Sequence, residues 1–365
     1  MRVLNWKNTF QLHFTIRIGF ASGAAVMIVE NLIITEYGSF VGKHSERLQV
    51  TRGGDIVQEA PLLHLRSVLI NSRGVSISAD AVEVCAERGI PLHFLDSSGR
   101  CLASLYSAGL GATILTRRAQ LEAANDQRAV HFIHAITSAK FHNQSATIKY
   151  MAKNRSDQPD LQRELRLRAD EIMDFTAQLD RVSIEEMETF RASVMGIEGS
   201  AARLYWNTVR LVLPDDYDWQ QRIGRGASDP VNSLLNYGYG ILYSQIEQAI
   251  ILAGLDPYAG FLHADRPGKP SLVLDLIEEF RQIAVDRVVF GLVNRNYDIE
   301  QDDHGKLTLE CRRDFAAKTL RHLDSLVRYS GKKYPLRGVI QMQARALAGY
   351  LRQERPSYEP FRSSW

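Results

Sequence analysis

An acidic helix follows a histidine-containing loop in the stretch Phe261-Leu-His-Ala-Asp-Arg-Pro-Gly-Lys-Pro-Ser-Leu-Val-Leu-Asp-Leu-Ile-Glu-Glu-Phe-Arg281. Ser271 stands where the loop ends and predicts the N-cap of that helix. Beyond this residue the helix has almost no polar face, and a helix that is apolar all round is buried. Its apolar residues are Leu272, Val273, Leu274, Leu276, Ile277, Phe280, Ile283, Ala284 and Val285.

Two acidic residues of this buried helix could do chemistry. Asp275 and Glu278 are three positions apart, so their side chains project from the same side of the helix. An ionised carboxylate is costly to bury unless it is paired or binds a metal. With His263 just upstream, one hypothesis is a divalent-metal site. The other is that the acids form ion pairs with Arg281 or Arg287.

A third candidate ligand is Glu198, which stands between Gly196 and Gly199 and is followed by small residues. Small residues on both sides of a carboxylate allow another backbone or a ligand to approach it closely. The alternative is a glycine-weakened helix in which Glu198 is an exposed side chain. The residues around Glu198 leave both interpretations open.

These segments together resemble the CRISPR-associated protein one family of spacer integrases. The order and the separations of the matching blocks fit that family, and the similarity covers roughly residues 28 to 345. The blocks are Gly196-Ile-Glu-Gly-Ser-Ala-Ala-Arg203, Ser228-Asp-Pro-Val-Asn-Ser-Leu-Leu-Asn-Tyr-Gly-Tyr239, Gly260-Phe-Leu-His263 with Ser271 to Arg281, Leu69-Ile-Asn-Ser-Arg-Gly-Val75 and Gly89-Ile-Pro-Leu-His-Phe-Leu95.

The resemblance implies a catalytic metal site with Glu198, His263 and Glu278 as ligands. It places Asp275 as a neighbouring acid that orients a ligand or replaces one. Oxygen-rich ligation with one imidazole suits Mg²⁺ or Mn²⁺ better than Zn²⁺. The expected reaction is attack of a DNA 3′-hydroxyl on a phosphodiester of a CRISPR array, which inserts a spacer. Water in place of that hydroxyl gives endonuclease activity.

The partners implied by the resemblance are double-stranded DNA from spacer and repeat, a second copy of the chain in a homodimer, and a dimer of CRISPR-associated protein two. We expect a cytoplasmic protein, since no apolar stretch reaches transmembrane length. Two other functions stay open. One is a structure-selective repair nuclease that cleaves branched DNA, and the other is a non-catalytic DNA-binding scaffold.

Several basic residues could contact DNA phosphates, which positions a duplex without reading its sequence. For Arg203 and Arg281, salt bridges to local acids are weighed equally with phosphate binding. The candidates are Lys149, Arg203, Arg222, Arg225, Lys269 and Arg281.

Composition agrees with a globular intracellular protein. The apolar and charged fractions are 45% and 24%, and the formal net charge is +2. The basic residues are unevenly distributed, with seven Lys or Arg against two Glu over residues 331–365. Cys85, Cys101 and Cys311 form no CxxC motif, so we expect reduced, packed thiols and no zinc site.

The chain is expected to have an α+β fold, in which a small N-terminal β-sandwich-like domain precedes a larger all-α catalytic domain. We assign residues 27–115 to the β domain, 116–345 to the helical domain and 346–365 to a basic tail. Residues 1–26 imitate a secretory signal, and we expect them to be a poorly ordered start-site extension, with Met27 as a possible initiator.

Short alternating runs predict the strands of the first domain. They are Leu32-Ile-Ile-Thr35, Arg47-Leu-Gln-Val-Thr51, Gly74-Val-Ser-Ile-Ser78 and Pro91-Leu-His-Phe-Leu-Asp96. A short helix is expected from Ala79 to Arg88, ended by Gly89 at the C′ position. In the second domain, Asp229 followed by Pro230 predicts the start of a long helix that runs through Ile250.

Overall fold

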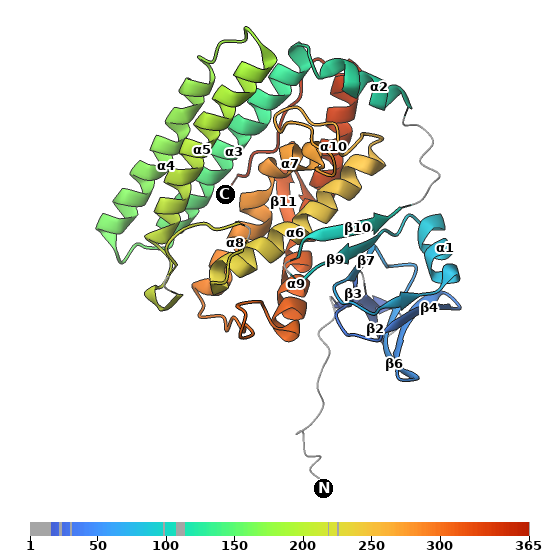
Figure 1. Ribbon diagram of the computed structural model, residues 1–365. Helices are drawn as coiled ribbons and strands as arrows, with labels where there is room; N and C mark the ends of the chain where they lie inside the picture. The colour runs from blue at the N-terminus through green and yellow to red at the C-terminus, as the bar shows by residue number, and fades with distance from the viewer. Residues whose placement is uncertain are drawn as a thin grey trace.

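The computed structural model describes residues 16–21, 24–29, 31–97, 99–106, 114–217, 219–224 and 226–364. Strands dominate the N-terminal part and helices the rest of the chain (Figure 1), which confirms the predicted α+β class. No helix among these residues is long and apolar enough to cross a membrane.

Two four-stranded sheets form most of the N-terminal domain. One has the order β10-β9-β7-β3 and the other the order β6-β5-β4-β8. Apolar side chains of both sheets pack with α1 (Ala79–Glu87) into one buried cluster that includes Leu32, Val50 and Val84. The strands are β3 (Asn31–Ile34), β4 (Phe40–His44), β5 (Arg47–Arg52), β6 (Asp55–Pro61), β7 (Ser67–Ile70), β8 (Ser76–Ile77), β9 (Leu92–Leu95) and β10 (Cys101–Leu105).

Each of the predicted strands coincides with a strand of the structure, namely β3, β5, β8 and β9, although β8 has only 2 residues. The predicted helix end is also confirmed, since α1 stops before Gly89, whose φ is +66°. The sequence analysis did not identify β4, β6, β7 and β10 as strands. The burial of β7 is continuous, and a continuously apolar strand lacks the alternation that identifies a half-buried one.

The N-terminal segment that we expected to be poorly ordered is only partly described. Residues 1–15 lie outside the described residues. Two strands of this segment, β1 (Ile16–Ala21) and β2 (Ala24–Val29), pair in antiparallel orientation. The sequence analysis did not predict these strands.

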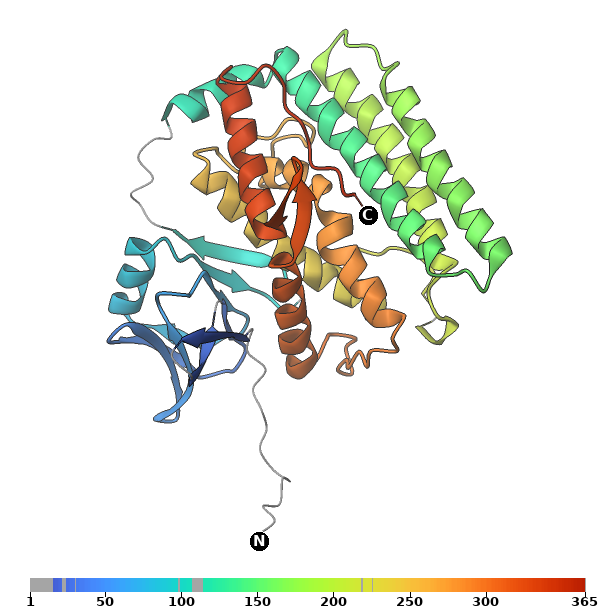
Figure 2. The same ribbon diagram turned by 180° about the vertical axis from the view of Figure 1, so that it is seen from behind.

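The helical domain consists of a layer of three long helices beside a second group of helices around α6 (Figures 1 and 2). The three long helices are α3 (Gln127–Lys153), α4 (Pro159–Leu179) and α5 (Met187–Arg210). Helix α6 (Pro230–Leu252) begins with Asp229 as N-cap, as predicted. The remaining elements are α2 (Ile114–Ala123), η1 (Asp215–Tyr217), α9 (Leu309–Leu323), β11 (Leu326–Tyr329), β12 (Lys332–Pro335) and α10 (Leu336–Leu351).

The buried acidic helix is broken into short pieces, which corrects the continuous helix that we predicted. They are α7 (Ser271–Leu276), the 3₁₀ turn η2 (Ile277–Glu279), the π turn η3 (Gln282–Asp286) and α8 (Arg287–Val293). Pro270 holds the N-cap position, so Ser271 is not the N-cap. The Ser271 hydroxyl accepts the Gly260 N–H at 2.9 Å instead and thereby ties the preceding loop to the helix.

The segment that we predicted as a basic tail begins inside α10 and then packs on the helical part of the chain. Helix α10 ends at Leu351, so residues 346–351 belong to that helix. Tyr358, Phe361 and Ser363 are buried. The Phe361 ring stacks on Phe280 with the ring centroids 5.4 Å apart, which places the end of the chain against the broken acidic helix.

The two domains meet where the β9–β10 turn lies against α6. A Cβ atom at Gly240 of α6 would lie 1.6 Å from the carbonyl oxygen of Gly99 in that turn. The Asn71 side-chain amide also donates to the hydroxyl of Tyr237. Gly240 is therefore required because two backbones approach too closely for any side chain.

We expect Gly240→Ala to lower the free energy of unfolding by about 2 kcal/mol or more, since the added methyl group pushes α6 away from the turn. Denaturant unfolding measures this change. The matched control is Gly338→Ala in α10, where an added Cβ meets nothing closer than 4.0 Å. Helix propensity predicts that the control gains up to about 1 kcal/mol. Equal effects of the two substitutions would contradict the close approach.

Candidate active site

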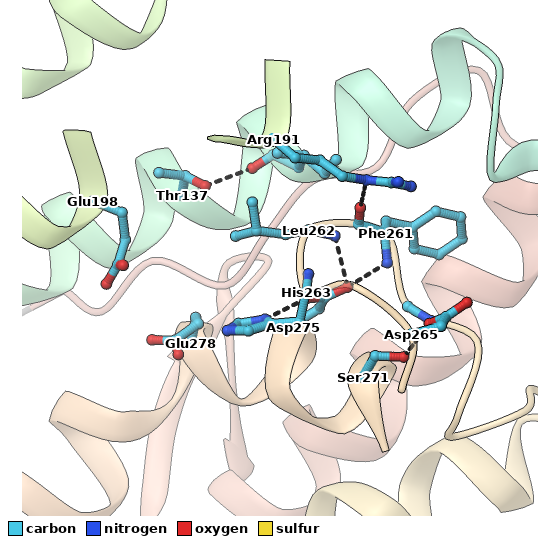
Figure 3. A network of polar contacts seen from close by, with 12 residues as sticks. Thr137, Arg191, Glu198, Phe261, Leu262, His263, Asp265, Ser271, Asp275 and Glu278 are labelled. Carbon is cyan, nitrogen blue, oxygen red and sulfur yellow. Dashed lines mark hydrogen bonds and ion pairs between the residues drawn. The ribbon is translucent and has the colours of Figure 1, made fainter. Parts of the chain in front are cut away.

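Glu198, His263 and Glu278 come from three different elements and line one pocket. Glu198 lies in the middle of α5, His263 in the loop between α6 and α7, and Glu278 in the 3₁₀ turn η2. Figure 3 shows both carboxylates and the imidazole around a common space. The other lining residues are Ile136, Thr137, Lys140, Met195 and Leu262.

Asp275 holds the histidine loop in place. Its carboxylate is fully buried and accepts the backbone N–H groups of Phe261, Leu262 and His263 at 2.6, 3.1 and 3.0 Å. Its Oδ1 also accepts a hydrogen bond from the Nδ1–H group of His263, with the two atoms 2.7 Å apart (Figure 3). This assigns the proton of the neutral imidazole to Nδ1 and leaves the Nε2 lone pair for a metal or a proton.

Glu278 is held as a carboxylate by two cations. Burial alone would raise its pKa, but the charges of Arg281 and Lys140 lower that pKa to about 2. Arg281 Nε donates to Oε1 at 3.1 Å. Oε2 forms an ion pair with Lys140 at 2.5 Å but makes no hydrogen bond of good geometry. Because Oε2 of the ionised Glu278 has an ion pair but no hydrogen bond of good geometry, this oxygen can exchange one cation for another.

Lys140 of α3 lies between the two carboxylates. Its ammonium group forms ion pairs with Oε1 of Glu198 and with Oε2 of Glu278. Burial alone would lower the pKa of Lys140, but the charges of Glu278 and Glu198 raise it. The sequence analysis missed this residue. The available signal was a lysine four positions after Ile136 and next to Phe141, on a helix face that is otherwise buried.

Glu279 faces away from the pocket and holds the C-terminal segment. It accepts the Phe361 N–H at 2.7 Å and the Gln343 side-chain amide at 3.0 Å, and the Tyr358 hydroxyl also donates to it. Burial raises the pKa of Glu279 to about 7. The two adjacent glutamates therefore have different surroundings, and the pocket receives Glu278, as the family resemblance implied.

Arg222 and Arg281 are half-buried and pack against Tyr239, and a DNA contact of either stays a prediction. Their guanidinium groups lie 5.3 and 4.8 Å from the ring centroid of Tyr239. Arg222 also donates to the side-chain oxygens of Asn232 and Asn236 at 3.0 and 2.6 Å. Arg281 takes the salt bridge that the sequence analysis had left open. Arg281 therefore contacts Glu278 of the site directly, and Arg222 packs on the same tyrosine ring as Arg281.

The other predicted DNA contacts have more open positions. Arg203 is exposed on α5, and Lys269 is half-buried in the histidine loop. Lys149 is exposed on α3 and forms an ion pair with Asp170 of α4 at 2.8 Å. Arg225 lies outside the described residues. A DNA contact of Arg203, Lys269 and Lys149 stays a prediction.

A second group of possible metal ligands lies between β9, β10 and α6. Among the described residues, His93, Cys101 and Glu247 have donor atoms that all lie within 4.8 Å of one another. The Ser104 hydroxyl contacts all three, at 2.9, 3.3 and 3.2 Å. Glu198, His263 and Glu278 share one pocket but do not approach one another this closely as a set. The three cysteines are free, as we predicted.

Comparison with known proteins identifies the family. The family model described as "CRISPR associated protein Cas1" matches residues 32–319. A protein of Archaeoglobus fulgidus named "CRISPR-associated endonuclease Cas1 1" is 36% identical over 92% of this chain and 99% of its own length. A protein of the same name from Francisella tularensis subsp. novicida is 36% identical over 92% of this chain and 100% of its own length.

Solved structures share the fold at lower sequence identity. The structure titled "Casposase bound to integration product" matches with a TM-score of 0.75 and 24% identity over 91% of this chain and 93% of that chain. A Cas1 protein from Thermotoga maritima matches with a TM-score of 0.73 and 20% identity over 90% and 99%. A chain of a "Cas6-RT-Cas1--Cas2 complex" matches with a TM-score of 0.73 and 22% identity over 92% and 36%.

The strand-rich N-terminal part and the helical rest of the chain define an α+β fold that these structures share. The chain belongs to the CRISPR-associated Cas1 family. This confirms the family resemblance that the sequence blocks carried.

We expect Asp275→Asn to weaken Mn²⁺ binding by about 10- to 100-fold, because an amide nitrogen at this position opposes N–H groups and no longer orients the imidazole. Calorimetric titration of the DNA-free protein measures the affinity. Asp265→Asn is the control, since Asp265 is in the same loop but contacts Ser271 and the Gly260 N–H, at 2.5 and 3.2 Å, and not the imidazole. An unchanged affinity in Asp275→Asn would contradict its orienting role.

Asp286 provides a test of the buried network. It accepts the Tyr205 hydroxyl at 2.7 Å and also the Tyr239 hydroxyl, and burial raises its pKa to about 6. An acid whose pKa is raised on folding stabilises the fold at low pH, and this contribution is lost as the pH rises through the folded pKa. From pH 4.5 to 7.5, Asp286→Asn should therefore gain stability relative to the unsubstituted protein, on the order of 2 kcal/mol. Urea unfolding at both pH values measures this, and a difference independent of pH would be evidence against it.

Proposed function

We propose that this chain is a divalent-metal-dependent DNA endonuclease and integrase that inserts spacer DNA into a CRISPR array. The proposal is based on one observation. The Lys140 ammonium group lies between the carboxylates of Glu198 and Glu278, next to the His263 imidazole that Asp275 orients. Carboxylates that share a cation, together with one imidazole, form a donor set that suits Mg²⁺ or Mn²⁺.

The residues of the pocket fit such an ion. The Lys140 ammonium group already occupies a cation position between the two carboxylates, and its ion pair with Glu278 Oε2 is a contact that a metal ion would replace. Glu198, His263 through Nε2, and Glu278 would hold the ion. When bound, it would stabilise charge on a phosphoryl oxygen and lower the pKa of a coordinated hydroxyl. Asp275 would act through the histidine and would not touch the metal, because its oxygens are occupied by the loop.

In the proposed reaction, the 3′-oxygen of the incoming DNA attacks a phosphodiester at the repeat boundary, and the new phosphate ester forms as the old one breaks. Such a transesterification exchanges one phosphodiester for another. Water as the attacking group gives strand cleavage at the same site. Arg203 and Lys269 would contact DNA phosphates, since both lie on elements that carry a proposed ligand.

Solved structures of the same fold support the proposed partners. One structure of this fold is a casposase bound to an integration product, and others are complexes of a Cas6-RT-Cas1 chain with Cas2. For this chain we propose double-stranded DNA, a homodimer and a dimer of CRISPR-associated protein two as partners, in the cytoplasm.

We expect Glu198→Ala, His263→Ala and Glu278→Ala each to lower strand transfer by at least about 10²-fold, because each removes a donor of the proposed ion. The assay uses a labelled short duplex, a supercoiled plasmid with a repeat, and Mn²⁺. Glu188→Ala, an exposed acid on α5, is the matched control and should retain activity. Circular dichroism checks that each variant is folded.

The products distinguish the alternatives. Joined half-site products that require the metal support the integrase. Cleavage of branched DNA without joining would favour a structure-selective repair nuclease. DNA binding without any product would favour a non-catalytic scaffold, and full joining by any one variant would remove that residue from the catalytic set.

A further inference from the structure

Lys140 is unusual among the lysines of this helix because it is buried. Its side chain is 10% exposed, whereas the side chain of Lys149 on the same helix is 49% exposed. A lysine is rarely buried to this degree unless it is paired. Here the pair is double, since the ammonium group contacts one oxygen of Glu198 and one of Glu278. Lys140 thus occupies the position between the two carboxylates.

The charges around this position are already balanced. Glu198 and Glu278 each carry one negative charge. The positive charge of Lys140 contacts both carboxylates, and the positive charge of Arg281 contacts that of Glu278. The Asp275 carboxylate is compensated separately by three backbone N–H groups and the imidazole N–H. A divalent ion added to this arrangement would bring two further positive charges beside a buried ammonium group, which is strongly unfavourable.

Both oxygens of Glu278 and one oxygen of Glu198 already contact a cationic side chain. The Lys140 ammonium uses one oxygen of each glutamate, and Arg281 uses the other oxygen of Glu278. A divalent ion can therefore reach both carboxylates only when Lys140 leaves.

We propose that Lys140 is an internal counter-ion that holds the two carboxylates of the metal-free protein together and must be displaced when a divalent ion binds. The inference rests on the proposed function, because it takes Glu198 and Glu278 as ligands. It makes metal binding an exchange of one cation for another. The measured affinity for the ion is therefore lower than the two carboxylates and the imidazole would give alone.

The displaced side chain has an open side to move to. Met195, one turn before Glu198 on α5, lines the same pocket and is 45% exposed, so the pocket meets solvent beside Glu198. The lysine stem has four carbons and carries three donors, so a modest rotation brings the ammonium group toward that side. This is the side on which a DNA phosphate would have room beside Glu198.

A lysine with a purely structural role makes the opposite prediction. If Lys140 only held the carboxylates in place for the metal, its removal would let them separate and metal binding would weaken. If it competes with the metal, its removal strengthens metal binding and destabilises the metal-free protein. The sign of the change in metal affinity therefore decides between the two roles.

The test uses the full chain without DNA, after removal of metal with a chelator. Lys140→Met keeps the length of the stem and removes the charge, and Lys140→Gln is a polar second variant in case the first fails to fold. Lys149→Met is the control on the same helix. Calorimetry measures the Kd for Mn²⁺, and thermal unfolding measures Tm with chelator and with Mn²⁺.

We expect Lys140→Met and Lys140→Gln to bind Mn²⁺ at least tenfold more tightly than the unsubstituted protein, with a lower Tm in chelator and a larger rise in Tm on adding Mn²⁺. Lys149→Met should match the unsubstituted protein. Unchanged or weaker Mn²⁺ binding in both Lys140 variants overturns the proposal. If Glu198→Ala and Glu278→Ala bind Mn²⁺ as the unsubstituted protein does, the proposed metal site itself fails, which is a separate result.

Discussion

The structure depends on how four carboxylates are buried within twelve residues of one apolar segment. Asp275, Glu278, Glu279 and Asp286 are all buried, although an unpaired ionised carboxylate is strongly disfavoured in such surroundings. Each acid therefore needs partners of its own, and they come from different directions. The histidine loop surrounds Asp275, Lys140 and the local arginine reach Glu278, the C-terminal segment covers Glu279, and two tyrosines contact Asp286.

This requirement explains why the segment is not a regular helix. In a regular α-helix, Asp275, Glu278 and Glu279 would point to overlapping sides of one cylinder, where their charges would repel one another. The 3₁₀ turn at residues 277–279 and the π turn at 282–286 change the direction of successive side chains. Departures of this kind from the α-helix are frequent at functional sites. They separate Glu278, which faces the pocket, from Glu279, which faces the C-terminal segment.

The four acids consequently have different chemical roles. Asp275 is saturated with N–H donors and can only orient its neighbour. Burial raises the pKa of Glu279 to about 7 and that of Asp286 to about 6. Both carboxylates accept hydrogen bonds from tyrosine hydroxyl groups, and these bonds connect segments that are distant in the sequence. Glu278 alone among the four lines the pocket of Glu198 and His263. The scaffold thus uses three buried acids to position one.

Much of the architecture could be predicted from the sequence because it depends on local patterns. The strand candidates, the helix end at Gly89 and the N-cap at Asp229 follow from alternation, a left-handed glycine and an Asp-Pro pair. The family resemblance also identified Glu198, His263 and Glu278, and the structure brings these residues to one pocket. The local features are visible in short stretches of the chain, whereas the three site residues were identified by the order of blocks that lie far apart.

Features that depend on distant partners were decided only by the tertiary structure. The packing of Arg222 and Arg281 on Tyr239 could not be seen in the sequence. The C-terminal residues were predicted as a basic tail, and in the structure Tyr358 and Phe361 of this segment dock on Glu279 and Phe280. Lys140 had no sequence motif, because its partner Glu198 lies 58 residues away on α5 and its partner Glu278 lies still further along the chain in η2. The sequence alone determined which side chains could bind a cation. The tertiary structure decided where these side chains meet and that Lys140 lies between them, because α3 packs against α5 and against the broken helix.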